Sequence, residues 1–121
     1  EKEVSAAKRL LQAAEHQAEK SETGSAYGHL ADGPKVGAAK KFTRAQKQNI
    51  REVNMVKNGG VLRSDDSGIE LVKPQKHAKS VTPPSNEAHV DHIISKASGG
   101  TNSYSNSQVL SREENLKKGA K

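Results

Sequence analysis

The chain contains no cysteine among its 121 residues, which excludes disulfide bonds and thiolate-ligated zinc sites. It also lacks tryptophan, has one phenylalanine and two tyrosines, and is 31% hydrophobic. Ordinary globular domains contain about 45–50% apolar residues, counting glycine, so we expect a thin core here. The sequence has no apolar run long enough to cross a bilayer and no signal-peptide segment, so we expect no membrane partner.

Positive charge, by contrast, is in excess: the formal net charge is +6 and the sequence pI is about 9.6. A basic surface favours an acidic partner, above all nucleic acid, although such charge also serves plain solubility. Residues 25–57 carry seven basic and two acidic residues. Two interpretations of this region stay open, namely contact with a phosphate backbone and an ordinary solvated helix face.

Hydrophobic periodicity predicts two helices before the final third of the chain. The first covers residues 3–20 and has a narrow stripe that is mostly alanine. Residues 21–41 are rich in glycine and predict a linker. The second helix begins near Thr43, where Thr-Arg-Ala-Gln is a capping-box pattern, and ends at Asn58-Gly59-Gly60. We therefore divide the chain into an N-terminal helix and Gly-rich linker, residues 1–41, and a second domain, residues 42–121.

Residues 61–72 predict a short hairpin around an Asp-Asp-Ser-Gly turn. Beyond it, residues 88–94 alternate as a strand, with Val90 on one face and His89 and Asp91 on the other. A loop, a short strand at residues 108–110 and a helix over residues 111–118 follow. This order of strand, loop, strand and helix predicts an α+β fold.

The same segment contains four motifs in a fixed order: Asp91-His92-Ile93-Ile94, Gly99-Gly100, Asn106-x-x-Val109-Leu110 and Asn115-x-x-Lys118-Gly119. Fifteen positions separate Asp91 from Asn106, and nine separate Asn106 from Asn115. This succession resembles the His-Asn-Asn variant of the HNH nuclease motif. The resemblance implies a ββα-metal HNH core with additional N-terminal helices. It also implies a metal-dependent endonuclease that hydrolyses DNA phosphodiester bonds.

Roles for five residues follow from that resemblance. His92 is the expected general base, because an imidazole with a pKa near 6.5 accepts a proton from water at cellular pH. Asn106 is expected to tie the loop together and orient His92, which makes these two the catalytic candidates. Asp91 and Asn115 offer hard oxygen ligands for one divalent cation, Mg²⁺ or Mn²⁺. Lys118 lies on the same side of the last helix as Asn115 and is expected to bind a phosphate.

Strict strand alternation introduces a rival arrangement, because neighbouring residues on a regular strand point to opposite faces. It pairs His89 with Asp91 in a His-x-Asp set, so His89 is a candidate additional ligand or phosphate contact. The resemblance places Asp91 and His92 at the strand end instead, on either side of the ion and the attacking water.

Many HNH nucleases carry a zinc knuckle of two Cys-x-x-Cys pairs. Here Ser64-x-x-Ser67 and Ser111-x-x-Glu114 stand at those places, so we expect no structural zinc.

The stretch from Phe42 onward is also similar to C-terminal toxin modules of Rhs-type polymorphic bacterial toxins. A toxin module implies export as part of a larger bacterial protein, action in the cytoplasm of the target cell, and a cognate immunity protein. The start at Glu1 rather than Met agrees with a piece of a longer chain. Two alternatives stay open: a phage or restriction-type HNH nuclease, and a non-catalytic DNA-binding module of the same fold.

Overall fold

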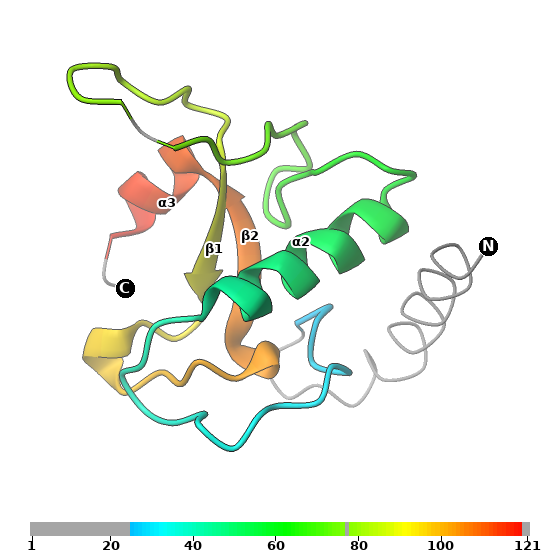
Figure 1. Cartoon of the computed structure of the whole chain (residues 1–121), viewed down its shortest axis with the longest axis vertical. Helices are drawn as coiled ribbons and strands as arrows, with labels where there is room; N and C mark the ends of the chain where they lie inside the picture. The colour runs from blue at the N-terminus through cyan, green and yellow to red at the C-terminus, as the bar shows by residue number, and fades with distance from the viewer. Residues whose placement is uncertain (1–24, 77, 120–121) are drawn as a thin grey trace.

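The computed structural model describes residues 25–76 and 78–119; the helix predicted over residues 3–20 lies outside them. A small α+β arrangement forms (Figure 1). Its elements are α2 (Arg44–Lys57), β1 (Ala88–His92), the 3₁₀ turns η2 (Lys96–Ser98) and η3 (Tyr104–Asn106), β2 (Ser107–Ser111) and α3 (Arg112–Lys118). Within the described ranges, none of the helices has the length and apolarity that crossing a bilayer requires.

β1 and β2 form one antiparallel pair in which His89 lies opposite Leu110 and Asp91 opposite Gln108. The predicted order of strand, loop, strand and helix is confirmed. The first strand ends at His92, two residues earlier than expected, and the second is longer by one residue at each end. Figure 1 shows α2 and α3 flanking this strand pair.

Helix α2 begins where the capping-box pattern predicts. The Thr43 hydroxyl accepts from the Gln46 backbone N–H at 3.1 Å, and the Gln46 side-chain oxygen accepts from the Thr43 N–H at 2.9 Å. The helix ends at its cap residue Asn58, and the next two residues, both glycines, have positive φ angles that glycine adopts without strain. Local sequence therefore sets both ends of α2.

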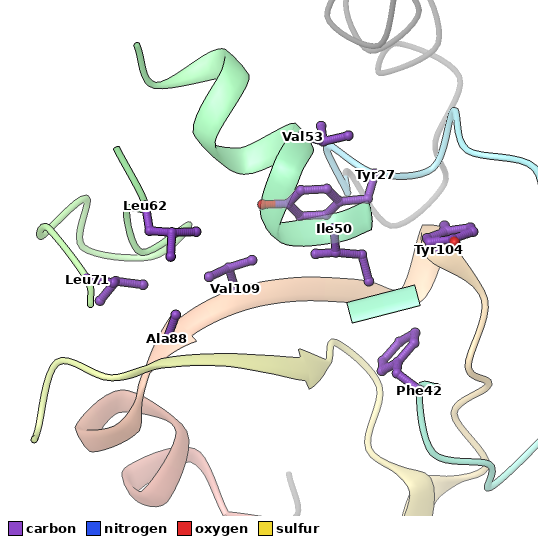
Figure 2. Close-up of a cluster of buried hydrophobic side chains, with 9 residues drawn as sticks. All are labelled: Tyr27, Phe42, Ile50, Val53, Leu62, Leu71, Ala88, Tyr104 and Val109. Atoms are coloured by element: carbon purple, nitrogen blue, oxygen red, sulfur yellow. The ribbon is translucent and has the colours of Figure 1, made fainter. Parts of the chain in front are cut away.

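The core lies between α2 and the strand pair (Figure 2). Ile50 and Val53 of α2 are 0% and 1% exposed and form the buried side of the helix, whereas Val56 is only half-buried. The full cluster consists of Tyr27, Phe42, Ile50, Val53, Leu62, Leu71, Ala88, Tyr104 and Val109. Burying one large aliphatic side chain contributes about 1.5–3 kcal/mol, so a cluster this small makes each member important.

The Gly-rich segment was predicted to be a linker, but its described part packs into the molecule. Tyr27 is 1% exposed in the core, and the Ser25 hydroxyl donates to the Ser107 carbonyl at 2.8 Å. Ala38 pairs with Thr101 in an isolated antiparallel bridge. Glycine and proline interrupt the periodicity that would have revealed this packing, because the segment contributes single anchors and no regular element.

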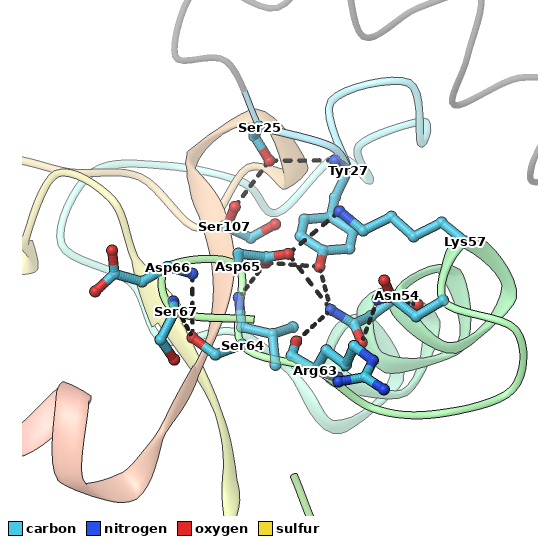
Figure 3. A network of polar contacts seen from close by, with 12 residues as sticks. Ser25, Tyr27, Asn54, Lys57, Arg63, Ser64, Asp65, Asp66, Ser67 and Ser107 are labelled. Carbon is cyan, nitrogen blue, oxygen red and sulfur yellow. Dashed lines mark hydrogen bonds and ion pairs between the residues drawn. The ribbon is translucent and has the colours of Figure 1, made fainter. Parts of the chain in front are cut away.

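A polar network centred on Asp65 joins this segment to α2 and β2 (Figure 3). The Asp65 carboxylate accepts from the Tyr27 hydroxyl and from the Val109 N–H, both at 2.7 Å, and from Lys57 Nζ at 3.2 Å. Asn54 Nδ2 donates to the Tyr27 oxygen at 3.0 Å. Burial, together with the nearby Asp65 charge, raises the pKa of Tyr27, so the tyrosine stays protonated and donates. Asp65 belongs to the predicted hairpin turn, which closes with an isolated antiparallel bridge between residues 63 and 70.

Candidate active site

Two residues of β1 and two of α3 meet on one face of the sheet. The Asp91 carboxylate forms an ion pair with Lys118 Nζ at 3.0 Å and accepts from Gln108 Nε2 at 3.0 Å. Asn115 Nδ2 lies 3.0 Å from His89 Nδ1. The strand alternation therefore places His89 and Asp91 together, and the i, i+3 spacing on α3 brings Asn115 and Lys118 to them in the same order.

His89 is held at both ring nitrogens. Because the Asn115 amide donates to Nδ1, the other nitrogen, Nε2, carries the proton and donates to the Glu87 carboxylate at 3.1 Å. Glu87 is 2% exposed and also accepts from the Gln75 N–H at 3.4 Å. The sequence pattern did not single out Glu87, although it precedes His89 by two residues and so shares its face.

His92 leaves the strand on the opposite side and is 9% exposed. Its ring lies against Phe42, with the ring centroids 4.4 Å apart, and Nε2 is 2.8 Å from the Lys40 carbonyl oxygen. A carbonyl only accepts, so Nε2 carries the proton and the neutral ring keeps its lone pair on Nδ1. Sequence reasoning missed Lys40 and Phe42, because about fifty residues separate them from the histidine that they hold.

Asn106 fixes the loop that follows His92. It is 4% exposed, and its side-chain oxygen accepts from the Ile94 N–H at 2.8 Å. Its amide donates to the carbonyls of Ile94 at 3.0 Å and of Thr101 at 2.9 Å. These three bonds hold the chain two residues beyond His92, so Asn106 acts on the histidine through the backbone.

The same loop docks the segment that carries the Lys40 carbonyl. Ala39 N–H donates to the Gly100 carbonyl at 2.9 Å, and the Asn102 amide donates to the Lys41 carbonyl at 3.3 Å. Both contacts flank Lys40 in the sequence. Asn106 therefore holds the loop, and the loop holds the residues on both sides of Lys40, whose carbonyl orients the His92 ring.

The donor set on the β1–α3 face suits a hard cation. Asp91 and Asn115 supply carboxylate and amide oxygens, the ligand types that Mg²⁺ and Mn²⁺ prefer. The Lys118 ammonium lies 3.0 Å from the Asp91 carboxylate and 2.9 Å from the His92 carbonyl oxygen, so this place already stabilises positive charge. Residues 25–76 and 78–119 contain no group of three His, Cys, Asp or Glu side chains placed for a metal, so water would complete any coordination shell here.

The four residues Ser64, Ser67, Ser111 and Glu114, at which the resemblance implied lost zinc ligands, lie together. Ser111 and Glu114 form the capping box of α3, with the Ser111 N–H donating to the Glu114 carboxylate at 2.8 Å. Burial acts to raise the pKa of Glu114, but hydrogen bonds from the Ser111 N–H and from the hydroxyls of Ser64, Ser67 and Ser111 outweigh it and lower the pKa to about 2. The ionised Glu114 carboxylate therefore links the turn that contains Ser64 and Ser67 to the start of α3.

Residues 75–121 match the family model of the HNH endonucleases. The matched segment contains β1, β2 and α3, and with them His89, Asp91, His92, Asn106 and Asn115. The match indicates nuclease activity, and HNH nucleases generally use a divalent metal ion. Searches of curated proteins and of solved structures found no match.

The HNH match covers less than half of the chain, and α2 lies outside it. So do Lys40 and Phe42, which hold His92. The matched segment therefore contains the candidate site residues, whereas the preceding residues fix the geometry of one of its side chains. The start of the nuclease domain at residue 42 stays a prediction.

Proposed function

We propose that this protein is a metal-dependent HNH endonuclease that hydrolyses DNA phosphodiester bonds, with His92 as the general base. The observation that carries the proposal is the match of residues 75–121, which include Asp91, His92, Asn106 and Asn115, to the HNH endonuclease family model. The Lys40 carbonyl oxygen accepts a hydrogen bond from His92 Nε2 at 2.8 Å, and Phe42 lies against the ring. In the neutral ring, this tautomer leaves Nδ1 as the basic atom that would accept the proton from water.

Phosphodiester hydrolysis requires an activated water, an in-line approach and stabilisation of the charge that grows on the leaving oxygen. His92 would take the proton from water after its ring turns from Phe42 toward the face of Asp91 and Asn115, because in this structure the ring points away from them. Asn106 would contribute indirectly, because it fixes the backbone on either side of the loop behind His92.

We propose that Asp91 and Asn115 hold one divalent cation, Mg²⁺ or Mn²⁺. When bound, that ion supplies Lewis-acid stabilisation of the negative charge at the leaving oxygen. Lys118, held beside Asp91, places a positive charge for contact with the substrate phosphate. His89 has its Nδ1 engaged by Asn115, so we assign it the role of orienting that amide, with direct phosphate contact as the alternative.

A supercoiled-plasmid assay separates this enzyme from a DNA-binding module of the same fold. Purified protein should nick the plasmid with MgCl₂ or MnCl₂, and EDTA should stop the reaction. Both kinds of protein would retard DNA in a gel, because both are basic. Retardation without nicking at any concentration of either metal would leave only the binding function.

We further propose that the domain is the toxin module of a larger exported bacterial protein, active in the cytoplasm of a target cell. The resemblance of residues 42–121 to Rhs-type toxin modules supports this, and so does the basic surface, which suits an acidic immunity protein. Induced expression in bacteria should stop growth and degrade the chromosome, whereas the His92→Ala variant should permit growth. Normal growth with active nuclease present would favour a phage or restriction-type enzyme.

A further inference from the structure

A cleft of about 340 Å³ lies along β1, and helix α2 contributes two cations to it. The cations are Lys47 and Arg51, spaced i, i+4 on one side of the helix. The opposite wall includes His89 and Asn115 of the candidate active site, and Pro74, Glu87, Ala88 and Val90 complete the lining. The α2 wall of the cleft is therefore basic, and the opposite wall contains Asn115, a proposed metal ligand.

Neither cation is neutralised within the described part of the chain. The side chains of Lys47 and Arg51 form no hydrogen bond or ion pair with another described residue. The carboxylate that lines the cleft, Glu87, binds His89 Nε2 and the Gln75 N–H instead. Arg51 is half-buried, and this burial lowers the pKa of its guanidinium.

This arrangement is unfavourable for stability alone. Like charges at i, i+4 repel along a helix, and partial burial of an unpaired guanidinium forfeits hydration without a compensating partner. A fully exposed lysine at position 51 would serve solubility better. Stability costs of this kind concentrate where a ligand later supplies the missing interaction.

We propose that this cleft binds a backbone phosphate of the substrate DNA, held by Lys47 and Arg51, beside the phosphate that is cut. The inference rests on the nuclease function proposed above. The planar guanidinium of Arg51 matches two phosphate oxygens at once, and the Lys47 ammonium adds a mobile point charge. Because the cleft also contains Asn115, a phosphate in it neighbours the reacting group, and the site would set the position of the strand.

The test is the salt dependence of DNA binding in EDTA, where no cleavage occurs. A short fluorescein-labelled DNA duplex is titrated by anisotropy over a series of KCl concentrations with wild type and with Lys47→Gln/Arg51→Gln. Each neutralised phosphate contributes about 0.9 to the slope of log K against log salt, so the double variant, which loses the one phosphate held in the cleft, should lose about 0.9. Arg51→Lys keeps the positive charge and should therefore keep the salt slope. It should bind DNA more weakly, because a lysine cannot contact two phosphate oxygens at once as the guanidinium does.

Lys76→Gln/Lys79→Gln is the matched control, since it removes the same charge from exposed residues outside the cleft. Its slope should fall by less than half as much. An equal fall in both double variants would mean diffuse attraction and would overturn the site. Urea midpoints verify folding, and the cleft variant should be at least as stable as wild type.

The two proposals fail separately. If the wild-type protein never nicks plasmid, yet the cleft variant lowers the salt slope more than the control variant does, the nuclease function is refuted and the phosphate site is supported. If the wild-type protein nicks plasmid, yet the salt slope of the cleft variant equals that of wild type, the nuclease function is supported and the phosphate site is refuted.

Discussion

Asn106→Ala should be the most destabilising of the asparagine substitutions at the site, because one side chain makes three hydrogen bonds to the loop backbone. The bonds measure 2.8 and 3.0 Å to the N–H and carbonyl of Ile94 and 2.9 Å to the carbonyl of Thr101. A hydrogen bond contributes about 0.5–1.5 kcal/mol net. We therefore expect the free energy of unfolding to fall by about 2–4 kcal/mol, measured by urea unfolding followed by circular dichroism.

Asn49→Ala is the control for this prediction. It makes the same chemical change in an exposed residue with one side-chain bond, from Nδ2 to the Tyr104 hydroxyl at 3.0 Å. The expected loss is about 0.5–1.5 kcal/mol. The cleavage rate should also fall in Asn106→Ala under conditions where the variant remains folded, because the loop no longer fixes the backbone near His92. Equal losses of stability in the two variants would refute the conclusion that the Asn106 side chain holds this loop through its hydrogen bonds.

Four further substitutions probe the fold by the same unfolding measurement. Gly100→Ala should prevent the native loop from forming, because a Cβ at this position collides with the Ile94 carbonyl. Gly99→Ala places its Cβ near no other atom, so it should lower the free energy of unfolding by only about 1 kcal/mol, the cost of its φ of 89°. Similar losses of stability in the two variants would contradict the loop geometry. Tyr27→Phe should lose about 1–2 kcal/mol, because Asp65 loses a buried donor, and an unchanged midpoint would exclude that role. Glu114→Gln should lose about 1–2 kcal/mol, because its carboxylate accepts from serine hydroxyls, and a gain in stability would contradict the network.

Local sequence predicted the elements well, because their determinants lie within a few residues of each other. The capping box at Thr43 and the glycines after Asn58 set the ends of α2, and both are confirmed. β1 followed from the alternation of residues 88–94, and β2 and α3 formed in the predicted order after it. The boundaries of β1 differ because the chain turns after His92, where hydrogen bonds from Asn106 replace the ladder.

Contacts between distant parts of the chain account for what the sequence could not predict. The Lys40 carbonyl and Phe42 hold His92 across about fifty residues, and a backbone carbonyl leaves no trace in residue identity. Tyr27 fills the core from a segment with no periodicity. The question left open by strand alternation has a structural answer: His89 shares a face with Asp91, and His92 points away from both.

The single-turnover rate of DNA cleavage by His92→Ala tests the central claim most directly. Wild type and variant are compared at saturating protein with MgCl₂, and DNA affinity is measured in parallel in EDTA. A positioned general base contributes about 10²–10⁴ in rate, so the variant should lose at least a hundredfold while binding DNA with nearly wild-type affinity. A variant that keeps more than about a hundredth of the wild-type rate would contradict the assignment of His92 as the base.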